Sequence, residues 1–268
     1  KEDLVGYTLA AANLPVVSTP EALSIIESLE KEQIITDLRY QEGGKDLFFQ
    51  LQVIPTTFED GEKGATLVLE DITERKRYVQ NMEFLAKTAM ELVDMPPEQD
   101  IYQYIADRIS ELVPKTLIQV ISYDEGSRQF TIQAIRDAHI RSALTRILGR
   151  DPVGLVVPMT EILSHPRGGN PLSLLQGQAW KFTFWPEIGP EGMSFYELSF
   201  RQIPPELCDE ICRTLPIGKA YFIFLVWGER LFGNVGIILP PDRELEDTQV
   251  VESFLRQASI AIARRQTE

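Results

Sequence analysis

Apolar residues recur at helical spacing just downstream of residue 70. They are separated by four, three, four and three positions and comprise Tyr78, Met82, Leu85, Ala89 and Leu92. This is the heptad spacing of a helix that packs against another helix. Two short polar residues suited to capping a helix, Asp71 and Thr73, stand just before it. The pattern predicts a helix over residues 78–93 that follows directly on a strand and ends before Pro96.

Upstream of this helix, the apolar period changes from helical to alternating. A helix with Thr19 as its cap and Pro20 at its first position is predicted within residues 15–29. Three strands follow, over residues 34–40, 48–54 and 65–72, with glycine-containing turns between them. Short turns join antiparallel strands, so residues 1–77 are expected to hold a small antiparallel sheet.

Downstream of the helix at residues 78–93, segments whose apolar residues have helical spacing are interspersed with segments whose apolar residues have strand spacing. The expected helices cover residues 98–113, 140–149, 206–215 and 242–266, and the expected strands cover residues 118–123, 129–135, 220–227 and 231–239. Residues 150–203 are rich in proline and show no clear period. The last helix carries a second heptad seam, formed by Val251, Leu255, Ala258 and Ile262.

The strand at residues 220–227 is apolar on both of its alternating faces. Tyr221 and Ile223 belong to one face, and Phe222 and Phe224 belong to the other. A strand that exposed one face to water would alternate with polar residues. Both faces of this sheet are therefore expected to be covered.

Two motifs resemble known sensory domains. Residues 71–76 read D-I-T-E-R-K and, with the strands and turns upstream, resemble the C-terminal half of a PAS domain. Residues 228–236 resemble the glycine-rich hairpin of GAF domains. The resemblance implies an α+β fold in two domains. Residues 1–77 would form a truncated PAS antiparallel sheet whose first strands lie upstream of Lys1. A long helix would link it to a GAF domain at residues 78–268, an antiparallel sheet with helices on one face and an inserted roof on the other.

Composition narrows the classes of partner. The chain has 268 residues, a length that suits two domains, and 26 Lys and Arg against 40 Asp and Glu give a net charge of −14. Nucleic acid is not expected as a partner, because phosphate contacts need clustered basic residues. No apolar run reaches the length of a membrane span and no signal peptide is evident, so a cytoplasmic protein is expected.

The sequence shows no motif of an enzyme. A phosphate-binding loop, an H-E-x-x-H zinc motif and a G-x-S-x-G nucleophile elbow are all absent, as are the catalytic parts of a histidine kinase. The chain is therefore expected to be non-catalytic. A hydrolase that uses His165 with a carboxylate is the weakest alternative.

The resemblance places a ligand cavity beneath the inserted roof. The candidate ligand-binding residues are His139, Trp180, Phe182, Phe184, Trp185, Tyr196, Cys208, Cys212, Tyr221 and Ile223. The cofactor is unknown; haem is the first to consider, with the cysteines, His139 and His165 as available ligands. A bilin attached at a Cys-His dipeptide is disfavoured, because Asp209 follows Cys208. The alternative is that the aromatic side chains fill a packed core and the cysteines are buried thiols.

These features indicate a sensory module of a signal transducer of the sensor histidine kinase type. A ligand under the roof would change the packing of the helices at residues 78–93 and 245–266, which an output module would read. Both helices are expected to pair across a homodimer, although each seam also fits a contact within one chain. The rival hypothesis is a ligand-free dimerisation or interaction module with a packed core.

Overall fold

The chain forms two compact units, residues 1–84 and 85–268. The computed structural model describes residues 32–42, 45–57, 61, 63–158, 180–184, 192–199, 201–215 and 217–267. The helix expected within residues 15–29 lies outside these ranges, as do Trp185 and His165. The division between the two units falls within the long helix α3 (Thr73–Asp94).

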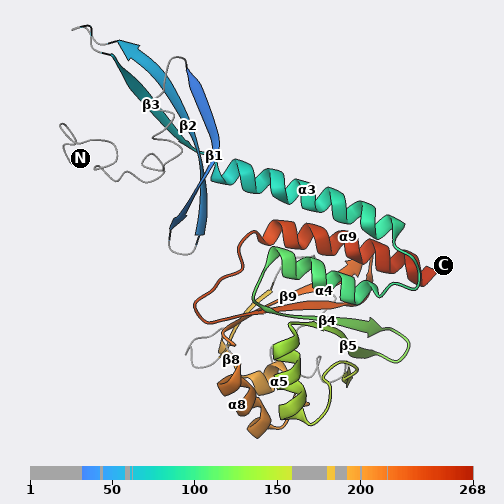
Figure 1. Ribbon diagram of the computed structural model, residues 1–268. Helices are drawn as coiled ribbons and strands as arrows, with labels where there is room; N and C mark the ends of the chain where they lie inside the picture. Colours follow the sequence, from blue (N-terminus) through green and yellow to red (C-terminus); the bar gives the residue numbers. More distant parts are fainter. Residues whose placement is uncertain are drawn as a thin grey trace. The chain divides into compact units, whose positions relative to one another are not determined.

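Unit 1 is built on the three strands that the sequence predicted. They are β1 (Gln33–Glu42), β2 (Lys45–Thr57) and β3 (Lys63–Asp71), paired antiparallel in the order β1-β2-β3 (Figure 1). Each is longer than predicted, because the ladder continues through polar residues that carry no apolar period. Leu38, Leu51 and Val53 form its buried cluster on one face of the sheet.

The passage from β3 into α3 is fixed by side-chain capping. The Asp71 carboxylate accepts a hydrogen bond from the Thr73 amide at 2.9 Å, and the Thr73 hydroxyl oxygen accepts one from the Phe48 amide at 2.9 Å. Thr73 is buried, and the Ile72 amide donates to the Phe48 carbonyl. The helix therefore begins at the capping residues expected from the sequence, ahead of the apolar seam that starts at Tyr78, and its first turn is tied to β2.

Unit 2 contains a seven-stranded sheet with the order β6-β5-β4-β10-β9-β7-β8. Its strands are β4 (Leu117–Asp124), β5 (Gln129–Arg136), β6 (Val156–Pro158), β7 (Trp180–Phe184), β8 (Gly192–Met193), β9 (Lys219–Trp227) and β10 (Arg230–Leu239). All neighbours pair antiparallel except β7 and β8. The proline-rich stretch thus contributes short strands toward both ends of the sheet, which its sequence did not indicate.

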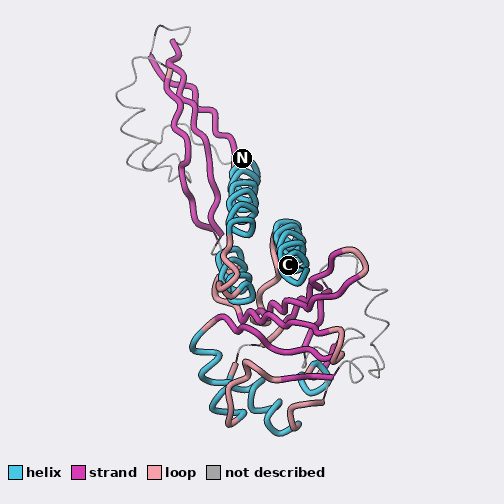
Figure 2. Tube along the Cα trace, turned by 90° about the vertical axis from the view of Figure 1, so that its right-hand side faces the viewer, coloured by secondary structure: helices cyan, strands magenta, loops and turns pink. Residues whose placement is uncertain are grey.

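Helices cover both faces of this sheet (Figures 1 and 2). The helices of unit 2 are α4 (Ile101–Leu112), α5 (Ala138–Leu148), α7 (Phe195–Leu198), α8 (Pro205–Thr214) and α9 (Thr248–Thr267). α4 and α9 lie on one face, and α5 and α8 lie on the other (Figure 1). The segment between the two hairpins, which was expected to roof the second face, covers it in part with helices, because α5 and α8 bury Leu144, Ile147 and Ile211 against the sheet.

Strand alternation sorts the sheet residues between these two faces. The α4–α9 face consists of Ile118, Val120, Tyr221, Ile223, Leu225, Val235 and Ile237, all buried. The α5–α8 face consists of Leu117, Gln119, Ile121, Ala220, Phe222, Phe224, Asn234, Gly236 and Ile238. The prediction that both faces of β9 are covered is thereby confirmed.

The closing helix α9 differs from the prediction in two ways. It begins at Thr248 instead of residue 242, and Asp247 just before it has a left-handed φ of 51°, which an α-helix cannot accommodate. Its heptad seam is buried within unit 2, from Val251 to Ile262. That seam therefore makes the contact within one chain that its spacing also allowed.

Candidate functional site

A polar band crosses the middle of the otherwise apolar α5–α8 face. Gln119 on β4 stands opposite Gly236 on β10, and Gly236 stands opposite Phe222 on β9. Asn234 lies two residues along β10, between Ile121 and Phe224. Neighbouring strands thus bring two side-chain amides and two aromatic rings together on one face.

Apolar clusters occupy the two ends of this face. At one end, α5 and α8 pack on Leu117, Ala220 and Ile238. A cavity of only about 20 Å³ remains there, beside Thr116 and Ile140. At the other end, Phe130 and Leu231 form a second cluster, into which Phe224 and Val226 pack. The polar band therefore lies between two filled regions.

Asn234 carries an unsatisfied acceptor in this band. Its side-chain oxygen Oδ1 is buried, and within the described part of the chain no group donates a hydrogen bond to it. Buried polar atoms in folded proteins almost always have a partner, and an unpaired one costs about 1–3 kcal/mol. A group that donates a hydrogen bond at this position would remove that cost.

Gly236 leaves room at the centre of the band for the side chains of its two neighbours, Gln119 and Phe222. A Cβ atom at this position would lie 2.9 Å from Cγ of Gln119 and 3.0 Å from Cε1 of Phe222. The Gln119 and Phe222 side chains therefore lean over the glycine backbone. Glycine in a strand interior often marks a position where another group approaches the backbone closely.

The sequence-based candidates divide between the two faces. Tyr221 and Ile223 lie on the α4–α9 face, away from Phe222. The Tyr221 hydroxyl donates to Glu244 at 2.5 Å, and burial together with this hydrogen bond raises the tyrosine pKa. Both residues belong to the core beneath α9, on the face opposite the polar band.

The remaining aromatic candidates are only partly described. Trp180, Phe182 and Phe184 belong to β7, whose backbone pairs with β9 so that Trp180 stands opposite Phe222. Tyr196 lies in the short helix α7 and is half-buried. β7 therefore lies next to the polar band, whereas Trp185 falls outside the described residues.

Of the cysteine and histidine candidates, Cys208 and Cys212 lie on α8 and His139 lies on α5. Cys208 is buried on α8, its thiol donates to the Ile203 carbonyl at 3.5 Å, and burial raises its pKa, which keeps it protonated at neutral pH. Cys212 is exposed one turn later, and His139 is exposed in the first turn of α5. In the described ranges no three His, Cys, Asp or Glu side chains gather at a metal-binding distance. Haem remains a prediction.

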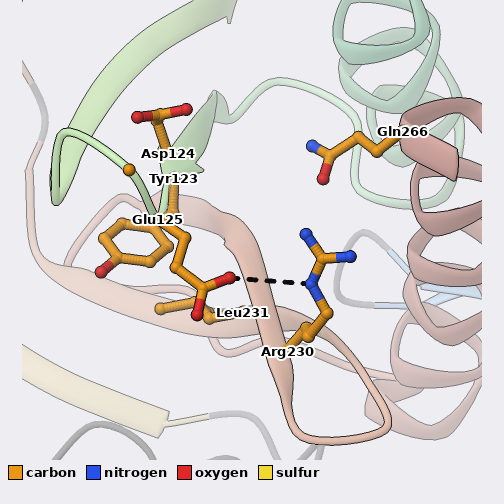
Figure 3. Close-up of a pocket in the computed structure, with 7 residues that line it drawn as sticks. Tyr123, Asp124, Glu125, Arg230, Leu231 and Gln266 are labelled. Atoms are coloured by element: carbon orange, nitrogen blue, oxygen red, sulfur yellow. Dashed lines mark ion pairs between the residues drawn. The ribbon is translucent and has the colours of Figure 1, made fainter.

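A separate surface groove of about 440 Å³ lies where two hairpin turns meet the end of α9 (Figure 3). Its charged groups are already engaged. Arg230 pairs with Glu125 at 3.7 Å, both side chains being exposed, and Asp124 accepts hydrogen bonds from the amide and hydroxyl of Ser127. An ion pair this exposed contributes little to stability. Among the described residues that line the groove, no buried side-chain polar atom lacks a hydrogen-bond partner.

Comparisons with known proteins give distant structural likenesses. The chromophore-binding domain of a Stigmatella aurantiaca bacteriophytochrome is 14% identical, with a TM-score of 0.46 over 92% of this chain and 77% of that one. The corresponding domain of RpBphP3 from R. palustris is also 14% identical, with a TM-score of 0.46 over 91% and 78%. The GAF domain of an Acinetobacter phosphoenolpyruvate-protein phosphotransferase is 7% identical, with a TM-score of 0.44 over 70% and 96%.

The sequence itself matches no protein-family model and no curated protein. Identities and TM-scores this low establish neither a family nor a function. The described helices include none that is long and apolar enough to cross a membrane.

Proposed function

We propose that the chain is a sensory module in which unit 2 is a GAF-like domain that binds a small molecule on its α5–α8 face. The chain's own topology supports this assignment. Two hairpins, β4–β5 and β9–β10, meet in the centre of the sheet through β4 and β10, with the proline-rich stretch between them in sequence. For unit 1 we propose the C-terminal half of a PAS domain, supported by three antiparallel strands that lead directly into α3.

The buried Asn234 Oδ1 carries the proposal for ligand binding. The ligand would donate an N–H or O–H group to this oxygen. Phe222 and Phe224, on the neighbouring strand, would lie against a planar or apolar part of the same molecule. This chemistry requires no metal and no covalent attachment to a cysteine.

A thermal-shift screen tests this proposal. Compounds with a planar ring and an N–H donor are added singly to the wild-type protein and to the Asn234→Leu variant. A ligand that binds only the folded state raises the melting temperature. We expect at least one such compound to stabilise the wild type and not the variant. Equal shifts in both proteins would contradict a role for Asn234.

The rival function is an interaction module without a ligand. The packing at the α8 end of the face favours it, because Leu117, Leu215 and Ile238 leave a cavity of only about 20 Å³ there. A cavity of this size holds at most a single water molecule. Under this rival account, the protein would show no specific thermal shift with any compound.

We also propose a homodimer, formed through α3. One side of this helix carries an exposed apolar stripe, defined as Val79, Met82, Met90 and Val93, with exposed fractions of 48%, 42%, 69% and 61%. At about 100° per residue these positions fall within about 80° of one another around the helix. In a parallel pair each stripe residue would meet its own counterpart, which makes the stripe self-complementary. Ala86 lies at the centre of the same side and is exposed.

Substitutions on this side of α3 should change dimerisation in opposite directions. We expect Met90→Glu to weaken the dimer at least tenfold, about 1.4 kcal/mol, because it adds a charge to an apolar contact. We expect Ala86→Leu to strengthen it by a similar factor, because the larger side chain buries more apolar surface between the helices. Sedimentation equilibrium measures both, with Gln80→Glu, away from the stripe, as the control. A wild-type protein that stays monomeric at micromolar concentrations would contradict the proposal.

The same proposal includes how a signal would leave the ligand site. A change at the ligand site would alter the packing of α3 and α9, and an output module of the histidine kinase type would read it. Catalysis would then belong to that module, in the cytoplasm. The support is the sequence resemblance, together with the packing of α9 and the C-terminal half of α3 in unit 2 (Figure 1).

A further inference from the structure

Arg265, in the last helical turn of α9, hydrogen-bonds to the backbone of the connection between α3 and α4. The Arg265 guanidinium donates through Nη1 to the Gln99 carbonyl at 2.8 Å and through Nη2 to the Pro96 carbonyl at 2.7 Å. Nη2 also lies 3.4 Å from the Met95 carbonyl oxygen. One planar cation thus binds carbonyl groups across residues 95–99.

These carbonyl groups have few partners within the turn. In this fully described stretch only the Gln99 amide donates back, to the Pro96 carbonyl at 3.1 Å, and the prolines at 96 and 97 have no amide hydrogen to offer. The last turn of α3 contains no basic residue of its own. Arg265 therefore supplies the positive charge that a helix C-terminus favours, from a different helix.

The C-terminal half of α3 follows α9 up to this point. The Thr88 hydroxyl lies 3.5 Å from Oε1 of Gln257, and Leu92 is buried one turn later. The two helices therefore run in the same direction. Thr88 of α3 lies beside Gln257 of α9, and further along both helices the turn after α3 lies beside Arg265. On the other side, the Tyr104 hydroxyl donates to Glu91 at 2.7 Å and ties α3 to α4.

We infer that Arg265 is a positioning residue that makes the turn at residues 95–99 and the last turn of α9 open and move as one element. A displacement of α3 then reaches the end of α9 directly, without passing through the sheet or the α5–α8 face. This coupling goes beyond the proposed ligand binding and exists with or without a ligand.

Amide hydrogen exchange of the full chain tests the coupling. We expect Arg265→Ala to speed exchange at least tenfold both at residues 98–101 and in the last turn of α9, with the amides of β4 and β10 unchanged. Arg265→Lys should give an intermediate effect, because an ammonium group cannot span the carbonyl groups as a planar fork does. Arg256→Ala, an exposed change on the same helix, is the control and should alter neither segment.

A double-mutant cycle separates coupling from a local effect. Pro97→Gly loosens the turn, and we expect it to speed exchange in the last turn of α9 several-fold when Arg265 is present and to add nothing in the Arg265→Ala or Arg265→Lys background. Additive effects, or no effect of Pro97→Gly on α9, would overturn the inference. All measurements use the protein without added ligand, so a failed ligand screen and a failed coupling test are distinguishable.

Discussion

Gly233→Ala is expected to destabilise unit 2 by about 4 kcal/mol or more, beyond the range of ordinary substitutions. Gly233 has φ +149°, a conformation that alanine rarely adopts, and it lies in β10 beside β4 at the centre of the sheet. A Cβ atom there would lie 1.9 Å from the Ile121 carbonyl oxygen and 3.0 Å from the Ser122 Cα. Both are backbone atoms of a central strand, so the clash can be relieved only by separating β4 from β10.

Two other glycines provide matched controls for this prediction. Gly126→Ala places its Cβ 3.6 Å from the Asp124 carboxylate, an ordinary contact, and should change stability by less than about 0.5 kcal/mol. Gly228→Ala meets nothing within 4 Å but has φ +60°, which costs about 1–2 kcal/mol. Urea unfolding of the three variants measures the series. A Gly233→Ala protein as stable as the Gly126→Ala protein would contradict the pairing of β10 with β4.

Phe254→Ala should cost about 3–5 kcal/mol, the range for removing a fully buried aromatic side chain. Phe254 is fully buried on α9, and its ring centroid lies 6.4 Å from that of Tyr104 on α4. The substitution leaves a void between both helices and the sheet, which rigid strands cannot close. Thermal unfolding followed by circular dichroism measures this loss of unfolding free energy.

The control for this prediction is Ile260→Ala on the same helix. Ile260 is 40% exposed, so the loss should stay below about 1 kcal/mol. Equal losses for the two variants would show that α9 does not pack on the sheet through Phe254.

The helices and strands of this fold can be predicted from local sequence patterns, whereas the way in which they pack into layers cannot. The strands at residues 34–40 and 220–227 were predicted because apolar and β-branched residues cluster between glycine turns. The heptad seam of α9 was equally evident, but a seam of this spacing fits a second chain and the chain's own sheet alike. Only the packing of Val251 and Leu255 in unit 2 distinguishes the two. The layer formed by α5 and α8 depends on contacts distant in sequence, which no local period reports.

The candidate site was missed for a similar reason. The sequence showed that β9 is covered on both faces, but it could not say which face each helix covers. Tyr221 and Ile223 were therefore grouped with residues of the opposite face. Asn234 and Gly236 interrupt an otherwise apolar run from Leu231 to Leu239, and that interruption was the available indication. Its meaning depends on Asn234 Oδ1 being buried, which only the structure shows.

The free energy of unfolding of Asn234→Leu tests the central claim most directly. If Asn234 Oδ1 is held unpaired for a ligand, leucine of similar size removes a buried unsatisfied acceptor. The variant should then be more stable than the ligand-free wild type, by about 1–3 kcal/mol, while losing the thermal response to any bound compound. A variant less stable than the wild type would show that Asn234 is already satisfied within the fold, and would contradict a ligand site on the α5–α8 face.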